Sequence, residues 1–318
     1  MDVPYVEYTY SNNKCNGYKY GAGTIFFIPE DAFSNEDGTD CSQTITIKYR
    51  ELHTKSDILV SGLNMIYILN GKRKILESSG MFEIKAECNG KPLRIKKGKR
   101  IQVRMKCLSE LKNLKTFIYD KKNEFWLNAN LPITDFSFRD SSNNKDNANL
   151  WGSSSVGNTS VIINEDLETM DSASYRRNIN NIIGTLPDGY IKGLNINETG
   201  IYNYDAIIND ENAVQIIASF KTNTGEDIKD KVYVCYPKKN TLIYYYPDDM
   251  KEKFALLQER GIKIFTVFAD GSTALIKDDA IEKLNLKTLR GKEHTFVLEK
   301  QPEKPKDKIS LAKSLKIQ

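Results

Sequence analysis

Apolar and polar residues alternate along several short runs in the first 127 residues of the chain. The run Thr44–Arg50 (TITIKYR) is a clear example, because Ile45, Ile47 and Tyr49 fall on one face of an extended chain. A period of two is typical of a half-buried strand. The same pattern or a short apolar run predicts strands at Thr24–Pro29, Leu63–Leu69, Met81–Glu87, Pro92–Ile95 and Ile101–Met105.

Turn-forming dipeptides separate these runs. Asn70-Gly71 and Asn89-Gly90 are pairs that two-residue hairpin turns favour, and the stretch Asn35–Thr39 (NEDGT) contains an Asp-Gly turn. The stretch Lys115–Leu127 predicts a last hairpin whose turn is Asp120–Asn123. Strands with this spacing and these turns predict a β-sandwich or meander over residues 1–127.

A second strand-rich region covers residues 190–300. Its predicted strands are Ala213–Phe220, Val232–Tyr236, Leu242–Tyr246 and Ile262–Phe268.

Two helices are predicted in this second region. Met250, Phe254 and Leu257 form one apolar stripe and predict a helix over Asp249–Arg260, with Gly261 at its C-terminal end. A second short helix is expected at Asp279–Leu284.

The remaining segments are polar. Residues 128–189 are rich in Ser, Asn and Gly and poor in apolar side chains, which predicts a linker or long loop, with one short helix at Tyr175–Ile183. Residues 301–318 are rich in Lys and predict a flexible tail. The predicted fold is therefore mainly β, with two β-sandwich-like domains at 1–127 and 190–300, a polar linker between them, and one or two short helices in the second domain.

Charge and hydropathy narrow the classes of partner. The 318 residues carry 46 basic and 42 acidic side chains, which is a mixed surface with a net charge of +4. A dedicated nucleic-acid binder has a stronger imbalance or a stacking motif, so we expect no nucleic-acid partner. No apolar run reaches the length of a membrane-spanning helix, so we expect no such helix.

Cysteine and histidine are sparse. The pairs Cys15 with Cys41 and Cys88 with Cys107 are candidate disulfides in an oxidising compartment, and buried thiols are the alternative. The chain has only 2 His, which excludes a His-rich metal site. No phosphate-binding loop or nucleophile elbow is present, so the sequence predicts no cofactor, no metal and no catalytic residue.

The segment Lys91–Lys106 is a candidate binding surface because it is rich in basic residues. Five cations stand out within it: Arg94, Lys96, Lys97, Lys99 and Arg100. One interpretation is a contact for an anionic polymer. The other, which we favour, is the solvated face of a hairpin whose Lys side chains protect an edge strand.

A run of tyrosines gives the second candidate surface. In a strand over Thr241–Tyr246, Tyr244 and Tyr246 share one face and Tyr245 lies on the other. Tyr244 and Tyr246 could form an aromatic platform for a glycan or a peptide. Packing in a core is the alternative.

Several motifs in the first half resemble a known family. Between Gly21 and Val103 the chain reads GAGTIFFIPEDAF, then SQTITIKYREL, DILVSGLNM and LESSGMFEIKAECNGKPLRIKKGKRIQV. This resembles the ZU5-like β-sandwich of uncharacterised exported or cell-envelope proteins of Bacteroidetes-type bacteria. Lys115–Trp126 resembles the segment that follows in those proteins, and Leu194–Ile207 resembles, more loosely, the first strand of their second domain.

The resemblance implies export and binding to protein partners, without an enzymatic activity. Self-cleavage at a His-Phe-Ser, known in some ZU5-type domains, is not implied, because neither His53 nor His294 is followed by Phe-Ser. Asp171-Ser172-Ala173 is similar to O-glycosylation sites of such exported proteins and makes Ser172 a candidate site.

The predicted function is therefore a non-catalytic module of the periplasm, outer membrane or cell surface that assembles with other envelope or surface proteins. The segment at Met1 lacks the features of a signal peptide, so either the protein is cytosolic or a leader was removed ahead of Met1, and the export that the resemblance implies requires the second case. A carbohydrate- or peptide-binding module and an unrecognised hydrolase are the alternative functions.

Overall fold

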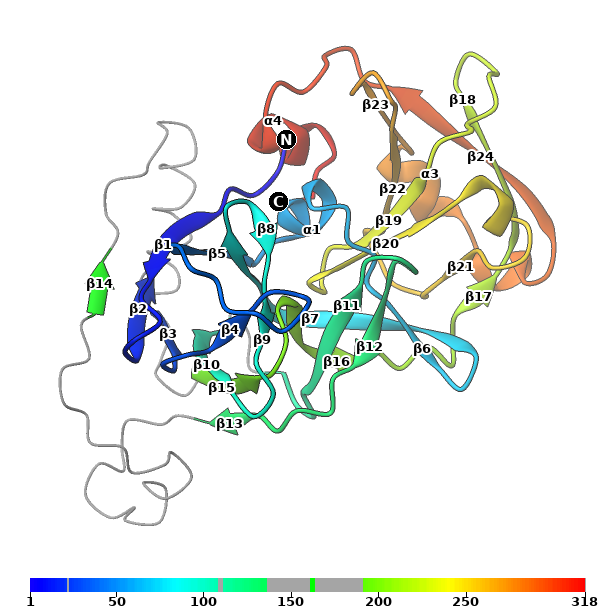
Figure 1. Ribbon diagram of the computed structural model, residues 1–318. Coiled ribbons are helices and arrows are strands. Elements are labelled where there is room, and N and C mark those ends of the chain that lie inside the picture. The colour runs from blue at the N-terminus through cyan, green and yellow to red at the C-terminus, as the bar shows by residue number, and fades with distance from the viewer. Residues whose placement is uncertain (22, 108–110, 136–160, 164–190, 318) are drawn as a thin grey trace.

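The computed structural model describes residues 1–21, 23–107, 111–135, 161–163 and 191–317. The chain is mainly β, with a few short helices, as the hydrophobic pattern predicts. Figure 1 shows the strands gathered into an N-terminal and a C-terminal group that lie side by side. No helix in the described ranges is both long and apolar enough to cross a membrane.

The largest sheet contains eight strands and is built around one long strand, β7 (Lys72–Cys88). Its order is β1 (Val6–Tyr10), β5 (Ile45–Leu52), β7, β16 (Gly200–Ile207), β11 (Lys115–Asp120), β12 (Phe125–Asn128) and β6 (Ile66–Leu69), and the short β8 (Lys91–Pro92) also pairs with β7. Strand β6 pairs with both β12 and β7, so the strands from β7 to β6 close into a ring.

A second sheet packs against the first. Its order is β13 (Thr134–Asp135), β15 (Ile191–Ile196), β10 (Ile101–Lys106), β3 (Thr24–Ile28), β2 (Asn16–Tyr20) and β14 (Val161–Ile163). Aromatic rings from both sheets form a stack, in which Phe26 lies 4.7 Å from Tyr49 and Tyr49 lies 5.9 Å from Phe82 between ring centroids. The N-terminal region is therefore a two-sheet sandwich with an aromatic core.

Two short pairs and one further sheet complete the β structure. The pairs are β4 (Phe33–Ser34) with β9 (Arg94–Ile95), and β17 (Val214–Gln215) with β21 (Ala255–Leu256). The C-terminal sheet has the order β18 (Ile217–Thr222), β24 (Glu293–Lys300), β23 (Thr273–Leu275), β22 (Lys263–Val267), β19 (Val232–Tyr236) and β20 (Thr241–Tyr245). Strands β18 and β24 are parallel, and the other neighbours are antiparallel.

The predicted domain boundary at residue 190 is wrong. Strand β15 pairs with β10 and β13, and β16 pairs with β7 and β11, so residues 191–207 belong to the N-terminal sheets. A strand's own pattern shows which face is apolar but does not identify its partner. Most of the predicted linker 128–189 and the predicted helix at Tyr175–Ile183 lie outside the described residues, and β13 and β14 are the described strands within that linker.

One of the two predicted C-terminal helices is confirmed, as α3 (Asp278–Lys283), which is followed by the 3-10 turn η5 (Leu286–Leu289). The helix predicted over Asp249–Arg260 is wrong, because only a short 3-10 turn, η4 (Pro247–Asp249), precedes strand β21. The carbonyls of Met250 and Phe254 accept hydrogen bonds from Ala218 and Ile216, so tertiary bonds replace helical ones there. Gly261 nevertheless has a positive φ, 78°, which is the conformation that a glycine after a helix adopts.

The prediction of a flexible tail is also wrong. Helix α4 (Lys308–Ser314) lies within residues 301–318 and begins with a capping box between Asp307 and Ser310. Its Leu311 and the following Leu315 are buried in the core. Lys308 Nζ lies 2.7 Å from Asp57 Oδ1 of α1 (Lys55–Val60), so the tail is held by packing and by charge.

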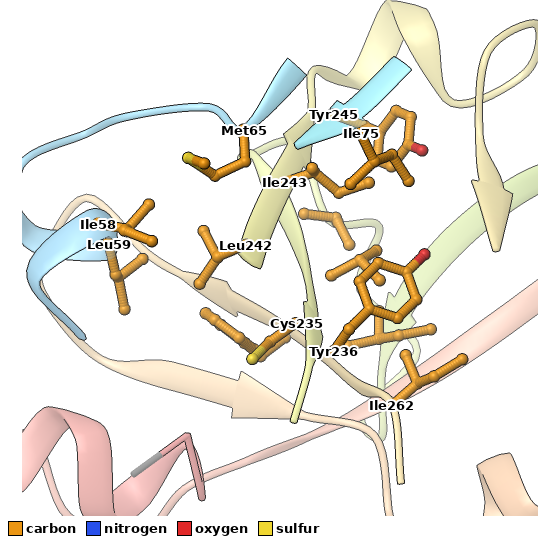
Figure 2. Close-up of a cluster of buried hydrophobic side chains, with 14 of the residues drawn as sticks. Ile58, Leu59, Met65, Ile75, Cys235, Tyr236, Leu242, Ile243, Tyr245 and Ile262 are labelled. Carbon is orange, nitrogen blue, oxygen red and sulfur yellow. The ribbon is translucent and has the colours of Figure 1, made fainter. Parts of the chain in front are cut away.

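The two strand groups share one hydrophobic core (Figure 2). Side chains of α1, β6 and β7 meet those of β19 and β20, and Met65, Leu242 and Ile243 lie together in the close-up. The backbone N–H of Met65 donates to Leu242 O at 3.2 Å, and the Asn64 side chain bonds both the N–H and the carbonyl of Tyr244. The edge of β20 is therefore covered by the N-terminal region.

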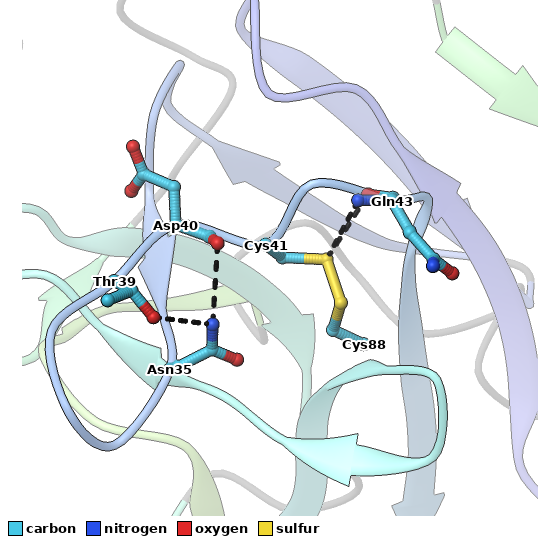
Figure 3. The surroundings of a disulfide bond; sticks show 6 residues. All are labelled: Asn35, Thr39, Asp40, Cys41, Gln43 and Cys88. Atoms are coloured by element: carbon cyan, nitrogen blue, oxygen red, sulfur yellow. Dashed lines mark hydrogen bonds between the residues drawn. A yellow bond between two sulfur atoms is a disulfide. The ribbon is translucent and has the colours of Figure 1, made fainter.

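The disulfide joins Cys41 to Cys88, so both predicted pairings, Cys15 with Cys41 and Cys88 with Cys107, are wrong (Figure 3). The register of β5 on β7 places Ile45 beside Cys88, and Cys41 lies just ahead of that strand. Asn35 Nδ2 donates to Thr39 Oγ1 at 3.0 Å and holds the loop that leads to Cys41. Cys107 and Cys235 are buried thiols, as the alternative predicts, and Cys15 is exposed.

Candidate functional site

The predicted tyrosine platform is only partly accessible. Tyr244 and Tyr246 share a face as predicted, with ring centroids 5.8 Å apart, but Tyr244 is 2% exposed and Tyr246 is 41% exposed. Lys231 Nζ lies 4.1 Å and 4.7 Å from the two ring centroids, and the Tyr246 hydroxyl donates to Glu124 Oε2 at 2.5 Å. The tyrosines therefore join the C-terminal sheet to the β11–β12 hairpin, and one ring remains for a ligand.

Acidic side chains from the loop at 30–40 pair with two of the five candidate cations, Arg94 and Lys96. Lys96 Nζ lies 2.5 Å from carboxylate oxygens of both Asp31 and Asp40, and Arg94 lies 2.8 Å from Glu36. The hydrogen bonds that Lys96 donates to Asp31 and Asp40 raise the pKa of its ammonium group.

Lys99 of the same segment donates to the carbonyl of Glu30. Lys97 and Arg100 are exposed. Two of the five candidate cations, Arg94 and Lys96, are therefore neutralised by acidic side chains of the same chain, and this disfavours a dedicated site for an anionic polymer.

A buried carboxylate that the sequence analysis missed lies on β7. Glu83 is fully buried, and its oxygens lie 2.7 Å from Arg50 Nη2, Lys121 Nζ and the Tyr5 hydroxyl. Burial by itself would raise the pKa of Glu83, but the hydrogen bonds from Lys121 and Tyr5 and the charge of Arg50 outweigh it and lower the pKa to about 2. Glu83 is an ionised structural hub that ties the N-terminal segment to β5 and β7.

A second cluster of buried polar side chains surrounds His53. His53 Nε2 lies 2.7 Å from Glu51 Oε2, and Asp57 accepts from the backbone N–H groups of His53 and Thr54. His53, Glu51 and Asp57 are each at most 5% exposed. These side chains hold the start of α1 in place and have no access to a solvent-borne substrate.

Asp205 on β16 is another buried acid. Its side chain is fully buried beside Asn203, whose Nδ2 lies 2.6 Å from Asp205 Oδ2. Burial raises the pKa of Asp205 far above its ordinary value. Burial is the largest cause, the nearby charge of Glu77 adds to it, and the hydrogen bond with Ser78 opposes it only in part.

The geometry most suited to a partner is the outer edge of β24. Ile217 N–H donates to Lys292 O, and Asn223 N–H donates to Leu298 O, so the even-numbered residues of β24 bond to β18. The N–H and C=O groups of Glu293, Thr295 and Val297 point to the opposite edge. On that edge β23 pairs only with Glu299 and Lys300.

Within the described ranges, no other strand pairs along residues 293–297 of β24 and no backbone hydrogen bond covers this edge. Figure 1 shows β24 running along the outer side of the C-terminal sheet, beside β18. The other edge of β18 is covered, because Ala218 N–H donates to Met250 O and Phe220 O accepts from Ile228. We call residues 293–297 the open β24 edge.

The face beside the open β24 edge is also exposed. Val297 is 52% exposed and Ile217 is 37% exposed, while Phe220, Phe296 and Leu298 point into the core. The hydroxyls of Ser219 and Thr295 lie 2.7 Å apart across the pair of strands. An unpaired strand with an exposed, partly apolar face is a template for a further strand.

The sequence analysis did not find this edge, although the alternation of exposed and buried residues in β24 is visible in its sequence. The candidate glycosylation residue Ser172 lies outside the described residues. No group of three or more potential metal-ligating His, Cys, Asp or Glu side chains occurs among the residues that the structure describes. No family model, curated protein or solved structure matches the chain.

Proposed function

We propose that the chain is a non-catalytic, exported module that assembles with another envelope protein by accepting a strand on the open β24 edge. The observation that carries the proposal is the row of outward N–H and C=O groups at Glu293, Thr295 and Val297 beside an exposed face. Strand addition satisfies such groups and gives affinity through main-chain hydrogen bonds. The resemblance of Gly21–Trp126 to ZU5-like sandwiches, which dock onto proteins, agrees with this role.

The disulfide supports export. Cys41 and Cys88 are joined, and disulfides persist in the periplasm and at the cell surface but are rare in the cytosol. The proposed compartment is therefore the periplasm, the outer membrane or the cell surface.

The side chains of the edge define the chemistry of the partner. On the exposed face, Glu293 is the charged residue of the open β24 edge and Val297 is the apolar one. A partner strand with a Lys or Arg opposite Glu293 and a β-branched residue opposite Val297 is complementary. A second copy of the open β24 edge has Glu293 as its charged residue on this face and offers no Lys or Arg to pair with Glu293. We therefore propose a different protein as the partner.

The test is Thr295→Pro in the full chain, with Thr295→Val as its matched control. Proline removes the outward N–H of Thr295 and blocks a neighbouring strand, whereas valine removes the hydroxyl and keeps the N–H. Cross-linking in native envelope fractions, followed by mass spectrometry, locates the partner through Lys292 and Lys300, which are exposed at the ends of β24.

We expect cross-links from Lys292 or Lys300 to an extended basic segment of an envelope protein. These cross-links should be retained in Thr295→Val and lost in Thr295→Pro. If Thr295→Pro fails to fold, Val297→Lys gives the same comparison through an exposed side chain. Cross-links that persist in Thr295→Pro, or that map to other elements only, would refute strand addition at this edge.

A further inference from the structure

A second surface of the C-terminal region is hollowed. Two hollows of about 700 and 350 Å³ adjoin one another and share Gln258, Glu259 and Lys287 as lining residues. The loop at 257–261 forms one side, and the segment 281–287, which spans the end of α3 and the start of η5, forms the other. Asn209 and Asn212 extend the lining at one end. We call this surface the loop groove.

Side-chain amides are distributed along the loop groove. Asn209, Asn212, Gln258 and Asn285 come from three separate segments of the chain. Each amide offers both a donor and an acceptor, which is the complement of a peptide unit. The Gln258 Nε2 group donates to the carbonyl of Asn212 at 2.7 Å, so the loop at 257–261 is tied to the turn at 209–212.

The groove also has an apolar part. Ile281 and Leu286 line it and are 6% and 9% exposed, and Leu284 lies between them in the sequence. These aliphatic side chains offer contact for an aliphatic side chain of a ligand. No aromatic residue lines either hollow, so the groove lacks the flat ring on which a sugar packs.

The charges of the groove are balanced. Glu259 and Glu282 oppose Arg260 and Lys287, and Arg260, Glu282 and Lys287 form no ion pair among the described residues. Glu259 lies 3.8 Å from Lys239 through Oε1, whereas its Oε2 is enclosed and has no hydrogen-bond partner in the described part of the chain. A buried acceptor without a donor is costly unless a ligand supplies one.

We propose that the loop groove binds an extended peptide segment that carries an aliphatic side chain and charges of both signs. The amides pair with its main chain, Ile281 and Leu286 contact the aliphatic side chain, and Arg260 and Glu282 pair with its charged side chains. This proposal rests on residues that the open β24 edge does not include, so each of the two sites stands or fails separately.

The probe is a phage-displayed library of random linear peptides, selected on the full-length protein. The enriched peptides are then synthesised and titrated by calorimetry against five proteins: the unchanged chain, Arg260→Glu, Asn285→Ala, Thr295→Pro, and Arg290→Glu as a matched control. Arg290 is exposed, follows η5 and does not line the groove.

We expect Arg260→Glu to weaken binding of acidic-residue-containing peptides by about tenfold or more, a hot-spot effect, and Arg290→Glu to leave it unchanged. Replacing the acidic residue of the peptide by Lys should restore binding to the Arg260→Glu protein. Thr295→Pro should bind the peptides normally, which separates this groove from the open β24 edge.

Three results would overturn the proposal: no enriched peptide, equal binding to all variants, or loss of binding in Thr295→Pro but not in Arg260→Glu. Titration with cellohexaose and chitohexaose tests the other class of ligand. Binding of either sugar that is abolished by Asn285→Ala, without peptide binding, would make the groove a glycan site instead.

Discussion

At the scale of single residues, the pairing of Arg50 with Glu83 shows how a polar position in a strand becomes part of the core. The two residues face one another across β5 and β7, and the N-terminal segment covers them. Arg50 Nη1 donates to Val3 O at 2.8 Å, and the Tyr5 ring lies 4.4 Å from the Arg50 guanidinium carbon. Removing one partner of such a pair leaves the other charge buried without compensation.

Glu83→Gln should lower the free energy of unfolding by about 3 kcal/mol at pH 7. The pKa of Glu83 falls from its ordinary value of 4.5 to about 2 in the folded protein. The folded state therefore favours the ionised form, so this stabilisation is present above pH 4.5 and is lost as the pH falls toward 2. Denaturant unfolding of both proteins between pH 7 and pH 2 measures the difference.

Glu7→Gln is the matched control, because Glu7 is more than half exposed and lies 3.7 Å from Lys48. An exposed ion pair of this kind contributes about 0.5 kcal/mol or less. A Glu83→Gln effect that stays constant from pH 7 to pH 2 would show that lost packing, and not the charge, causes the change.

At the scale of elements, α4 is a short amphipathic helix whose stability comes from its docking surface. Seven residues are too few for a stable isolated helix. For this reason the Lys-rich sequence of the tail predicts a flexible segment. Asp307 and Ser310 cap its first turn, while Leu311 and Leu315 pack into the shared core and Lys308 pairs with the buried Asp57.

Leu315→Ala should lower the free energy of unfolding by about 2–5 kcal/mol, because the side chain is fully buried and its removal leaves a cavity. Ile309→Ala on the same helix is the control, since Ile309 is 49% exposed and should change stability by less than about 0.5 kcal/mol. Thermal and denaturant melts give both values. Equal, small effects of the two substitutions would mean that the tail does not dock in solution.

At the scale of the whole molecule, the shared core joins the sandwich to the C-terminal sheet. The side chains of Leu242 and Met65 lie together in Figure 2. Ion pairs such as Lys74 with Asp210 and Arg73 with Asp249 lie around this core. An interface of buried aliphatic side chains couples the stabilities of the regions that it joins.

Leu242→Ala should therefore destabilise both regions together, by about 2–5 kcal/mol. Hydrogen exchange of amides in β5 and in β22, read by mass spectrometry, measures the opening free energy of each region. Both values should fall by the same amount, and exposed Ile217→Ala should change neither by more than about 0.5 kcal/mol. Faster exchange in β22 alone would show that the two regions unfold independently.

The sequence by itself determined most strands and turns, because the signals are local. Alternation predicts β5 and β10, and the Asn70-Gly71 and Asn89-Gly90 turns are present with positive φ at both residues of each pair. Such patterns depend on the face that a side chain occupies and on the conformations that Asn and Gly tolerate. The tyrosine face was predicted on the same grounds, since Tyr244 and Tyr246 do lie together.

Tertiary structure decided everything that depends on which segments meet. Strands β15 and β16 joined the N-terminal sheets, Cys41 paired with Cys88, the stretch Met250–Leu257 exchanged helical bonds for bonds to β17 and β18, and the tail docked. The open β24 edge exists because β23 ends after Leu275, and burial of Tyr244 removes half of the predicted platform. Hydrogen bonds and apolar contacts between residues far apart in sequence have no local signature, so only the folded chain reveals them.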